Sequence, residues 1–295
     1  MRRVSNRPAT SPMQAPASVA RRLEREAGFG WSRRRMFFES ASVMATHLGD
    51  DVDGVTYIVS TRDRRSLRLF TKHRLKEWRT LEQALVHLDI AGLGTGARER
   101  LFLDVGANIG TPCIHAVSRH GFRQAIAFEA EPENFRILQA NVAINGLGHK
   151  IQSYNLAVSQ GCGVVELAID PEWSGAHRIG CTCSGQSSIE VQAVALDEFL
   201  PEIGIEPTDV GLLWIDVEGH EPEVLRGAST LLARLVPIVL EVSHANLGLL
   251  PIVHSYSSFV DLRLDSQPLP LSKLPEVMED RERRERSTTD VLLLP

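Results

Sequence analysis

The stretch LFLDVGANIG, residues Leu101–Gly110, decides the fold class. A short apolar run ends at Asp104 and Val105, and a glycine-rich turn follows at once. An apolar run of this length, bounded by a turn, is typical of a strand buried in a parallel sheet. Gly106 and Gly110 allow the backbone to turn sharply into a helix and to approach a ligand closely. The stretch therefore predicts a strand–turn–helix unit.

Further apolar runs repeat this pattern along the chain. They are AIAFE (125–129), LLWID (212–216) and VPIVLEV (236–242), with TDVLLLP (289–295) as a final buried strand. Helices are expected to begin at Pro132 and at Pro222, because proline favours the first helical position. Residues 163–170 and 188–192 indicate an additional strand pair. Alternating runs and helices predict an α/β domain, residues 100–295, with a mostly parallel sheet covered on both faces.

Two regions are expected ahead of this domain. Residues 1–35 carry nine arginines among prolines, alanines and serines, which is typical of a disordered tail and also of an organellar transit peptide. Residues 36–99 are expected to form an extension that packs on the core. A hairpin is predicted within Val55–Thr71, and a helix over Thr80–Gly92 with Thr80 and Gln83 as its capping box.

Composition excludes several functions and leaves others open. The chain of 295 residues has a net charge of −5, so no nucleic-acid partner is expected, and no apolar stretch is long enough to predict a membrane span. Four cysteines indicate reduced thiols in a cytoplasm rather than a disulfide framework. Cys162, Cys181, Cys183 and His177 form an alternative zinc set, but their spacing fits no common pattern, so no metal is expected. The sequence does not indicate an oligomeric state.

The acidic strand ends indicate the kind of cofactor. Glu129 follows Gly110 by 19 residues, which is the usual distance of an acidic residue that binds ribose hydroxyls. The turn lacks two glycines of the dinucleotide pattern, because Asn108 and Thr111 stand in their places. Asp104 would repel a diphosphate, whereas S-adenosylmethionine carries an ammonium and a sulfonium. These residues favour S-adenosylmethionine over a nicotinamide dinucleotide.

Four motifs in this order resemble the FkbM family of S-adenosylmethionine-dependent methyltransferases. They are FLDVGANIG, AFEAEPENFRILQANVAINGL, ALDEFL and LLWIDVEGHEPEVLRGA, and they lie within residues 100–245. The resemblance implies the class I methyltransferase, Rossmann-like fold: a doubly wound, mostly parallel sheet of seven strands with an antiparallel last strand. It also implies O-methylation of a small-molecule or glycan hydroxyl, on a sugar or natural product. The segment Glu129-Ala130-Glu131-Pro132 departs from the family pattern. The family often has proline directly after the first glutamate, whereas here Ala130 follows Glu129.

The resemblance and the strand ends together predict the site residues. The cofactor-binding residues are Asp104, Gly106, Ala107, Asn108 and Gly110 at the amino-acid end, Glu129 at the ribose, and Asn155 and Ala157 near the adenine. The catalytic residues are Asp216, Glu218 and His220, with Asp216 as the first choice for the base or the acceptor anchor.

Three alternatives remain open at this point. Asp216 and Glu218 have the oxygen ligands that a divalent metal prefers. An oxidoreductase that uses a nicotinamide cofactor could have a similar sheet, and a non-catalytic protein could retain the fold. Trp173, Gly175 and His177 lie in a loop that could cover an acceptor, whose identity the sequence does not indicate.

Overall fold

The computed structural model describes residues 31–73, 75–170, 173–180, 187–264, 267–285 and 287–295. The predicted tail therefore lies outside the described residues, except for residues 31–35, which belong to helix α2 (Trp31–Ala41). Cys181 and Cys183 of the alternative zinc set also lie outside them. Within the described part of the chain, no helix combines the length and the apolar character needed to cross a membrane.

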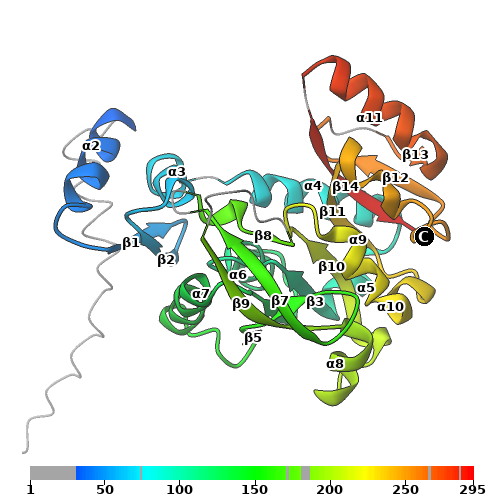
Figure 1. Ribbon diagram of the computed structural model, residues 1–295, viewed down its shortest axis with the longest axis horizontal. Coiled ribbons are helices and arrows are strands. Elements are labelled where there is room, and N and C mark those ends of the chain that lie inside the picture. Colours follow the sequence, from blue (N-terminus) through cyan, green and yellow to red (C-terminus); the bar gives the residue numbers. More distant parts are fainter. Residues whose placement is uncertain (1–30, 74, 171–172, 181–186, 265–266, 286) are drawn as a thin grey trace, which may run out of the picture.

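Among the described residues, eight strands form one large sheet in the order β13-β12-β14-β11-β10-β3-β4-β5 (Figure 1). The strands are β3 Leu101–Val105, β4 Gln124–Phe128, β5 Ile151–Tyr154, β10 Val210–Ile215, β11 Ile238–Ser243, β12 Ser258–Asp261, β13 Leu269–Pro270 and β14 Thr288–Leu294. Strands β11, β10, β3, β4 and β5 pair in parallel, and β14 is antiparallel to both β11 and β12. The predicted antiparallel last strand is confirmed, and the two-residue β13 adds an eighth strand at the edge.

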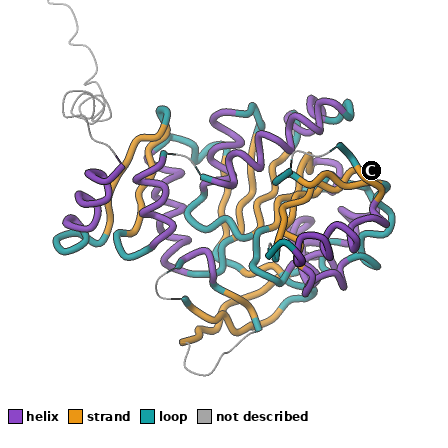
Figure 2. The backbone as a smooth tube through the Cα atoms, turned by 90° about the horizontal axis from the view of Figure 1, so that it is seen from above, coloured by secondary structure: helices purple, strands orange, loops and turns teal. Residues whose placement is uncertain are grey.

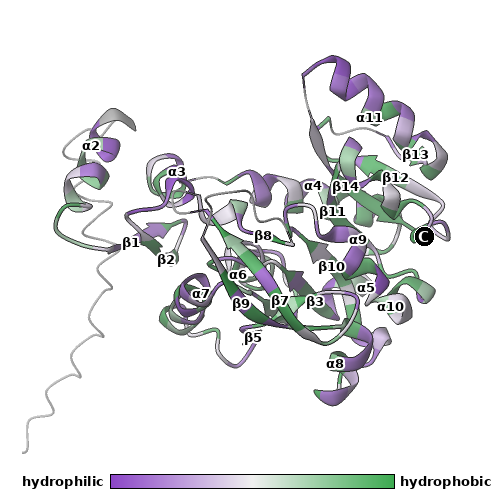
Figure 3. Cartoon of the chain, viewed as in Figure 1, coloured by the Kyte–Doolittle hydropathy of each residue, from purple (hydrophilic) through white to green (hydrophobic). Residues whose placement is uncertain are grey.

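Helices cover both faces of this sheet (Figure 2). One face carries α4 Lys76–Ile90, α5 Gly94–Arg98, α6 Thr111–Arg119 and α7 Pro132–Ile144; the other carries α8 Leu196–Glu202, α9 Glu221–Arg226, α10 Ser229–Ala233 and α11 Leu274–Arg283. Alternation along β3 explains the two layers, because Phe102 packs in the first and Leu103 and Val105 pack in the second. The central strands are apolar, whereas α2 and α11 are largely polar (Figure 3).

A smaller sheet lies beside the large one. It contains β6 Ala157–Val158, β7 Gly163–Ile169, β8 Arg178–Ile179 and β9 Ser187–Val194, in the order β6-β9-β7-β8. The predicted strand pair is confirmed, because β7 and β9 are antiparallel partners from Gly163 to Ile169. The loop between β7 and β8 holds a short 3₁₀ helix, η1 Ser174–Ala176; the others are η2 Pro207–Asp209, η3 His244–Leu249 and η4 Leu271–Lys273.

The N-terminal hairpin lies one element earlier than predicted. It pairs β1 His47–Val52 with β2 Val55–Ser60 through Asp53 and Gly54, whose φ angles of 53° and 83° fit a two-residue hairpin turn. The prediction that the second half of Val55–Thr71 forms a strand is wrong, because Arg64–Lys72 forms helix α3. Asp63 caps this helix by accepting from two backbone N–H groups, and Ser66, Leu69 and Phe70 bury one helical face.

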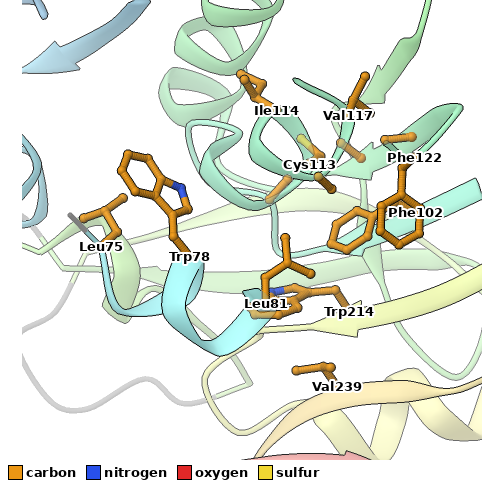
Figure 4. Close-up of a cluster of buried hydrophobic side chains, with 14 of the residues drawn as sticks. Leu75, Trp78, Leu81, Phe102, Cys113, Ile114, Val117, Phe122, Trp214 and Val239 are labelled. Carbon is orange, nitrogen blue, oxygen red and sulfur yellow. The ribbon is translucent and has the colours of Figure 1, made fainter. Parts of the chain in front are cut away.

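Helix α4 also begins earlier than predicted. Leu75 precedes its first turn, so Thr80 lies buried inside the helix and forms no capping box. The reason is that Trp78 packs in the core one turn ahead of Leu81. Figure 4 shows Leu81 of α4 beside Trp214 of the sheet, whereas the Trp78 ring points away from that strand and stacks on His115 of α6. The extension therefore contributes to the same core as the sheet.

Asn141 of α7 fastens the hairpin to the large sheet's helices. Its side chain is fully buried, and its Oδ1 accepts the Ile58 N–H at 2.6 Å. Its Nδ2 donates to the Ile109 carbonyl at 2.9 Å and to the Ile58 carbonyl at 3.2 Å. Ile109 lies in the glycine-rich turn after β3, so one side chain connects the hairpin to that turn.

We expect Asn141→Ala to lower the free energy of unfolding by at least about 2 kcal/mol, because each buried polar group left without a partner costs about 1–3 kcal/mol. Gln139→Ala, an exposed position on the same helix, serves as the control and should change it by less than about 0.5 kcal/mol. Urea denaturation of both variants measures the difference. Equal stability of the two variants would contradict the anchoring role.

Candidate functional site

The turn after β3 comes into direct contact with the end of β10. Gly106 has a φ of 86°, and a Cβ there would lie 2.0 Å from the Asp216 carbonyl oxygen, so only glycine fits. The N–H groups of Gly106 and Ala107 donate to the Phe128 carbonyl at the end of β4, at 3.0 and 2.9 Å. Gly110, with a φ of 88°, precedes α6. The ends of β3, β4 and β10 are thereby held together.

Glu129 follows β4 and faces this turn. Its two carboxyl oxygens accept the N–H groups of Asn108 at 2.7 Å and Glu131 at 2.8 Å. Burial raises the pKa of the Glu129 carboxyl to about 7, although both N–H groups act to lower it. Nδ2 of the exposed Asn155 donates to the Glu129 carbonyl at 2.9 Å. Glu129 is thus held in one orientation by the backbone around it.

Asp104 lies deeper than the sequence analysis placed it. The residue is fully buried, and its Oδ2 accepts the Cys113 N–H in the first turn of α6 at 3.1 Å. Burial raises the pKa of its carboxyl to about 7. Its Oδ1 is buried without a hydrogen-bond partner in the described structure. Asp104 therefore orients the turn from beneath.

A cavity opens beyond the carboxyl ends of β3, β4 and β10. Of the predicted site residues, Gly106, Asn108, Glu129, Ala157, Asp216 and Glu218 line it, whereas Asp104, Ala107, Gly110, Asn155 and His220 do not. The structure thus brings the predicted ribose, amino-acid and catalytic positions to one cavity. Ala157 lines its wall together with Leu156 and Val158 at the start of the smaller sheet.

A second cavity adjoins the first. Both are lined by Arg65, Gly175, Asp216 and Glu218. The second one extends between the N-terminal extension and the ends of β10 and β11, and its lining includes Arg68, Lys72, Lys76, Glu77, Trp173, Glu241 and Asp290. Two compartments therefore meet at the two carboxylates that the sequence indicated as catalytic.

Asp216 and Glu218 have unusual acidity at this junction. Burial raises the pKa of the Asp216 carboxyl to about 8, while the Arg65 guanidinium acts in the opposite direction. Burial and the nearby Glu241 also raise the pKa of Glu218. Glu218 has a φ of 52° and lies 3.7 Å from Arg178. A carboxyl with a pKa near neutrality is suited to exchange protons at physiological pH.

Arg65 is a site residue that the sequence analysis missed. It forms an ion pair with Glu77 of α4. Burial would lower its pKa, but Glu77, Asp216 and Asp63 raise it, so the guanidinium is positively charged. The sequence feature that could have located Arg65 on a helix is the capping residue Asp63 before an amphipathic segment. This pattern predicts a helix rather than a strand. The extension thereby supplies a cation to the junction of the two cavities.

Hydrogen bonds connect the loop around η1 to both the N-terminal extension and the glycine-rich turn. The Ser174 N–H donates to Asp63 Oδ1 at 3.0 Å, and Asn108 Nδ2 donates to the Ser174 carbonyl at 2.9 Å. Trp173 and Gly175 line the second cavity, and His177 lines the first. The predicted covering loop therefore lies over the junction.

His220 does not join the two carboxylates. Its Nε2 lies 3.0 Å from Ser159 Oγ, its Nδ1 lies 3.7 Å from Glu223, and burial lowers its pKa. Neighbouring Glu221 is fully buried, where it accepts from the Gly219 N–H and the Asn246 amide. Both residues hold the loop between β10 and α9, and neither lines the cavities.

This sheet order, with a glycine turn after β3 and acidic strand ends, defines the class I methyltransferase fold. The chain matches the family described as the methyltransferase FkbM domain over residues 104–264. It belongs to this family, which confirms the resemblance seen in the sequence.

Two characterised relatives and one solved structure show the extent of the similarity. Hexuronic acid methyltransferase AglP of Haloferax volcanii is 32% identical over 144 residues, which cover 47% of this chain and 54% of the relative. Methyltransferase sdnD of Sordaria araneosa is 26% identical over 172 residues, covering 47% and 63%. The chain thus spans less than two thirds of either relative. The crystal structure of Methyltransferase FkbM from Methylobacillus flagellatus KT has a TM-score of 0.41 at 12% identity, over 88% of this chain and 59% of that one.

The raised pKa of Asp216 predicts how stability depends on pH. In the unfolded chain its carboxyl ionises near pH 3.8, and in the fold near 8. Between these values the folded state holds a proton that the unfolded state has lost, so this contribution to stability falls as pH rises. From about pH 5 to about pH 8, the parent should therefore lose at least about 1 kcal/mol more than Asp216→Asn does.

Denaturation curves across this pH range measure the effect. Glu99→Gln, at an exposed position, is the control and should follow the parent. The same pH dependence in the parent and in Asp216→Asn would show that burial does not raise the pKa of the Asp216 carboxyl.

Proposed function

We propose that the protein is an S-adenosylmethionine-dependent methyltransferase that methylates a hydroxyl oxygen on a sugar or related natural product. The observation that carries this proposal is that two adjoining cavities meet at Asp216 and Glu218. The first cavity fits the cofactor and the second fits the acceptor. Membership in the FkbM family supports the same reaction class.

The residues of the first cavity fit a cofactor with positive charge. Asn108 Oδ1 is buried and has no partner in the described structure, so it can accept from an ammonium group. Glu129 keeps unused lone pairs for ribose hydroxyls, because a carboxylate accepts about four hydrogen bonds. Asp216 and Glu218 favour a nearby sulfonium and would repel the diphosphate of a nicotinamide dinucleotide. These features argue for the methyltransferase over the oxidoreductase alternative.

The chain's own residues supply positioning and proton transfer. When bound, S-adenosylmethionine supplies an electrophilic methyl group on a sulfonium. Asp216 would take the proton of the acceptor hydroxyl as its oxygen bonds to the methyl carbon, while the bond between that carbon and sulfur would break and leave a neutral thioether. A positive charge nearby lowers the pKa of Asp216, so the carboxylate is ionised when the cofactor is present. We propose that no metal is needed, because Arg65 already balances negative charge at this junction.

The second cavity fits a hydroxylated acceptor that carries a negative group. Trp173 offers an aromatic surface on which a sugar ring can pack. Arg68 and Lys72 are exposed, and neither has an ion pair among the described residues, although Arg68 stacks on Trp173 at 5.8 Å. Both cations can pair with a carboxylate of the acceptor. The activity named for the Haloferax volcanii relative, hexuronic acid methylation, supports a uronic acid as the acceptor class.

Labelled S-adenosylmethionine and a panel of acceptors test this function. We expect methyl transfer to uronic acid glycosides, and weaker transfer to their neutral counterparts. Calorimetry should show binding of S-adenosylhomocysteine and none of NAD. Tight NAD binding without a response to S-adenosylhomocysteine would overturn the methyltransferase proposal.

Replacing Glu129 should weaken cofactor binding selectively. Glu129→Ala removes the proposed acceptor of the ribose hydroxyls, so affinity for S-adenosylhomocysteine should fall by about 1.5–3 kcal/mol, the range for hydrogen bonds to a charged group. Glu133→Ala, an exposed acid in the first turn of α7, is the control. Isothermal calorimetry measures both variants, with circular dichroism to monitor the fold. Unchanged affinity in Glu129→Ala would refute the ribose assignment.

Asp216→Asn should lower turnover at least tenfold at saturating cofactor, since general bases contribute about 10²–10⁴-fold. Asparagine keeps the shape of aspartate but takes up no proton near neutral pH. Parent turnover should rise with pH and level off below about pH 8, because the cofactor's charge lowers the pKa of Asp216 from about 8. The variant should lack this rise.

Glu223→Gln is the matched control, because Glu223 pairs with Arg226 on α9 and does not line the cavities. Affinity for S-adenosylhomocysteine should be close to the parent's in both variants. A variant Asp216→Asn with parental turnover and the parental pH profile would remove Asp216 from the mechanism.

A further inference from the structure

Glu82, His115 and His120 place three side-chain atoms that can bind a metal close together, where α4 lies beside the C-terminal part of α6. One carboxyl oxygen and two ring nitrogens all lie within 4.8 Å of one another. The distance between His115 Nε2 and Glu82 Oε1 is 3.9 Å. Glu82 belongs to α4, His115 to α6, and His120 directly follows α6. The glycine-rich turn of the cofactor cavity lies at the opposite end of the same helix, so this cluster is separate from the proposed active site.

Both histidines have the chemical form that binds a metal. The Nε2 atoms of His115 and His120 are buried and have no hydrogen-bond partner in the described structure. Neutral imidazole is a common metal ligand. Buried polar atoms without a partner in the protein are rare in stable folds, and such atoms often bind an ion or a water molecule.

The surrounding side chains hold the cluster in place. The Trp78 ring stacks on His115 with 4.9 Å between centroids, and its N–H donates to the Thr111 carbonyl at 3.0 Å. A pocket lined by Glu82, His115 and His120 also includes Tyr57, whose hydroxyl is a third buried group without a partner. Three unsatisfied polar atoms around one pocket indicate that it accommodates a polar ligand.

The charges around the pocket are compatible with a cation. Arg119 lines the pocket and opposes a positive charge, whereas Glu82 and Asp53, which also line it, favour one. His120 is at the C-terminal end of α6, where the helix dipole stabilises a positive charge. The balance therefore permits a divalent ion that Glu82 contacts directly.

We propose that Glu82, His115 and His120 bind a zinc ion that fastens α4 of the N-terminal extension to α6 of the methyltransferase domain. Two imidazoles and a carboxylate suit Zn²⁺ better than Mg²⁺ or Ca²⁺, which prefer oxygen ligands alone. Zinc bonds of about 2.0–2.1 Å place tetrahedral ligand atoms about 3.4 Å apart. The three ligand atoms, which lie within 4.8 Å of one another, therefore approach one another by up to about 1.4 Å on binding. Water completes the coordination.

Metal titration of the full chain tests the proposal. After treatment with a chelator, the parent should bind one equivalent of Zn²⁺ in competition with a chromophoric chelator. Co²⁺ should give the visible absorption of a tetrahedral site. The melting temperature should rise with zinc concentration, because the ion binds only the folded state at this site.

Glu82→Gln and His120→Asn should each lower zinc affinity at least tenfold and reduce the thermal shift. Neither residue lines the proposed cofactor cavity, so affinity for S-adenosylhomocysteine should remain that of the parent. Glu99→Gln and His149→Asn, both at exposed positions, are the matched controls and should bind zinc like the parent.

Three results would overturn the proposal. The first is the absence of stoichiometric zinc binding by the parent. The second is unchanged zinc affinity in both Glu82→Gln and His120→Asn. The third is loss of binding in Asp216→Asn or in a Cys181→Ser, Cys183→Ser double variant, which would place the ion elsewhere.

Discussion

The burial of carboxyl groups at the ends of parallel strands is the constraint on which this structure depends. Asp104 and Glu129 are buried and Asp216 is partly buried, and burial raises the pKa of each carboxyl. Backbone N–H groups partly compensate for Asp104 and Glu129. Among the described residues, no N–H group donates to the Asp216 carboxyl, and the charge of Arg65 acts to lower its pKa. A cationic ligand beside these carboxyl groups would offset the same electrostatic cost of burial.

The N-terminal extension is part of the site and not an appendage. Arg65 and Glu77 come from α3 and α4, and their ion pair stands at the junction of the two cavities. Asp63 holds the loop that carries Ser174 above that junction. Trp78 of α4 packs in the same hydrophobic core as the sheet residues Phe102 and Trp214 (Figure 4). The helices that complete the core thus also bring positive charge to the acidic strand ends.

The two-cavity arrangement separates the proposed cofactor site from the proposed acceptor site. The proposed cofactor cavity is lined by the strand ends and the glycine turn, where a Cβ at Gly106 would collide with backbone. The proposed acceptor cavity is lined by exposed side chains of α3, such as Arg68 and Lys72, and by Trp173. Exposed side chains can change without cost to the core. The lining of the second cavity can therefore change without loss of the fold.

The sheet and the lining of the proposed cofactor cavity could be predicted from the sequence, because strand periodicity, Gly106 and Glu129 act through local geometry. The sequence placed Asp216 and Glu218 together for the same reason, since both follow one strand. The sequence did not predict helix α3, because the apparent β propensity of the segment after Asp63 outweighed the helix-capping signal of Asp63. Only the tertiary structure brought Arg65 to Asp216, removed His220 from the junction, and assembled Glu82 with His115 and His120. Those contacts join residues distant in sequence, whose meeting depends on how helices pack and not on any local pattern.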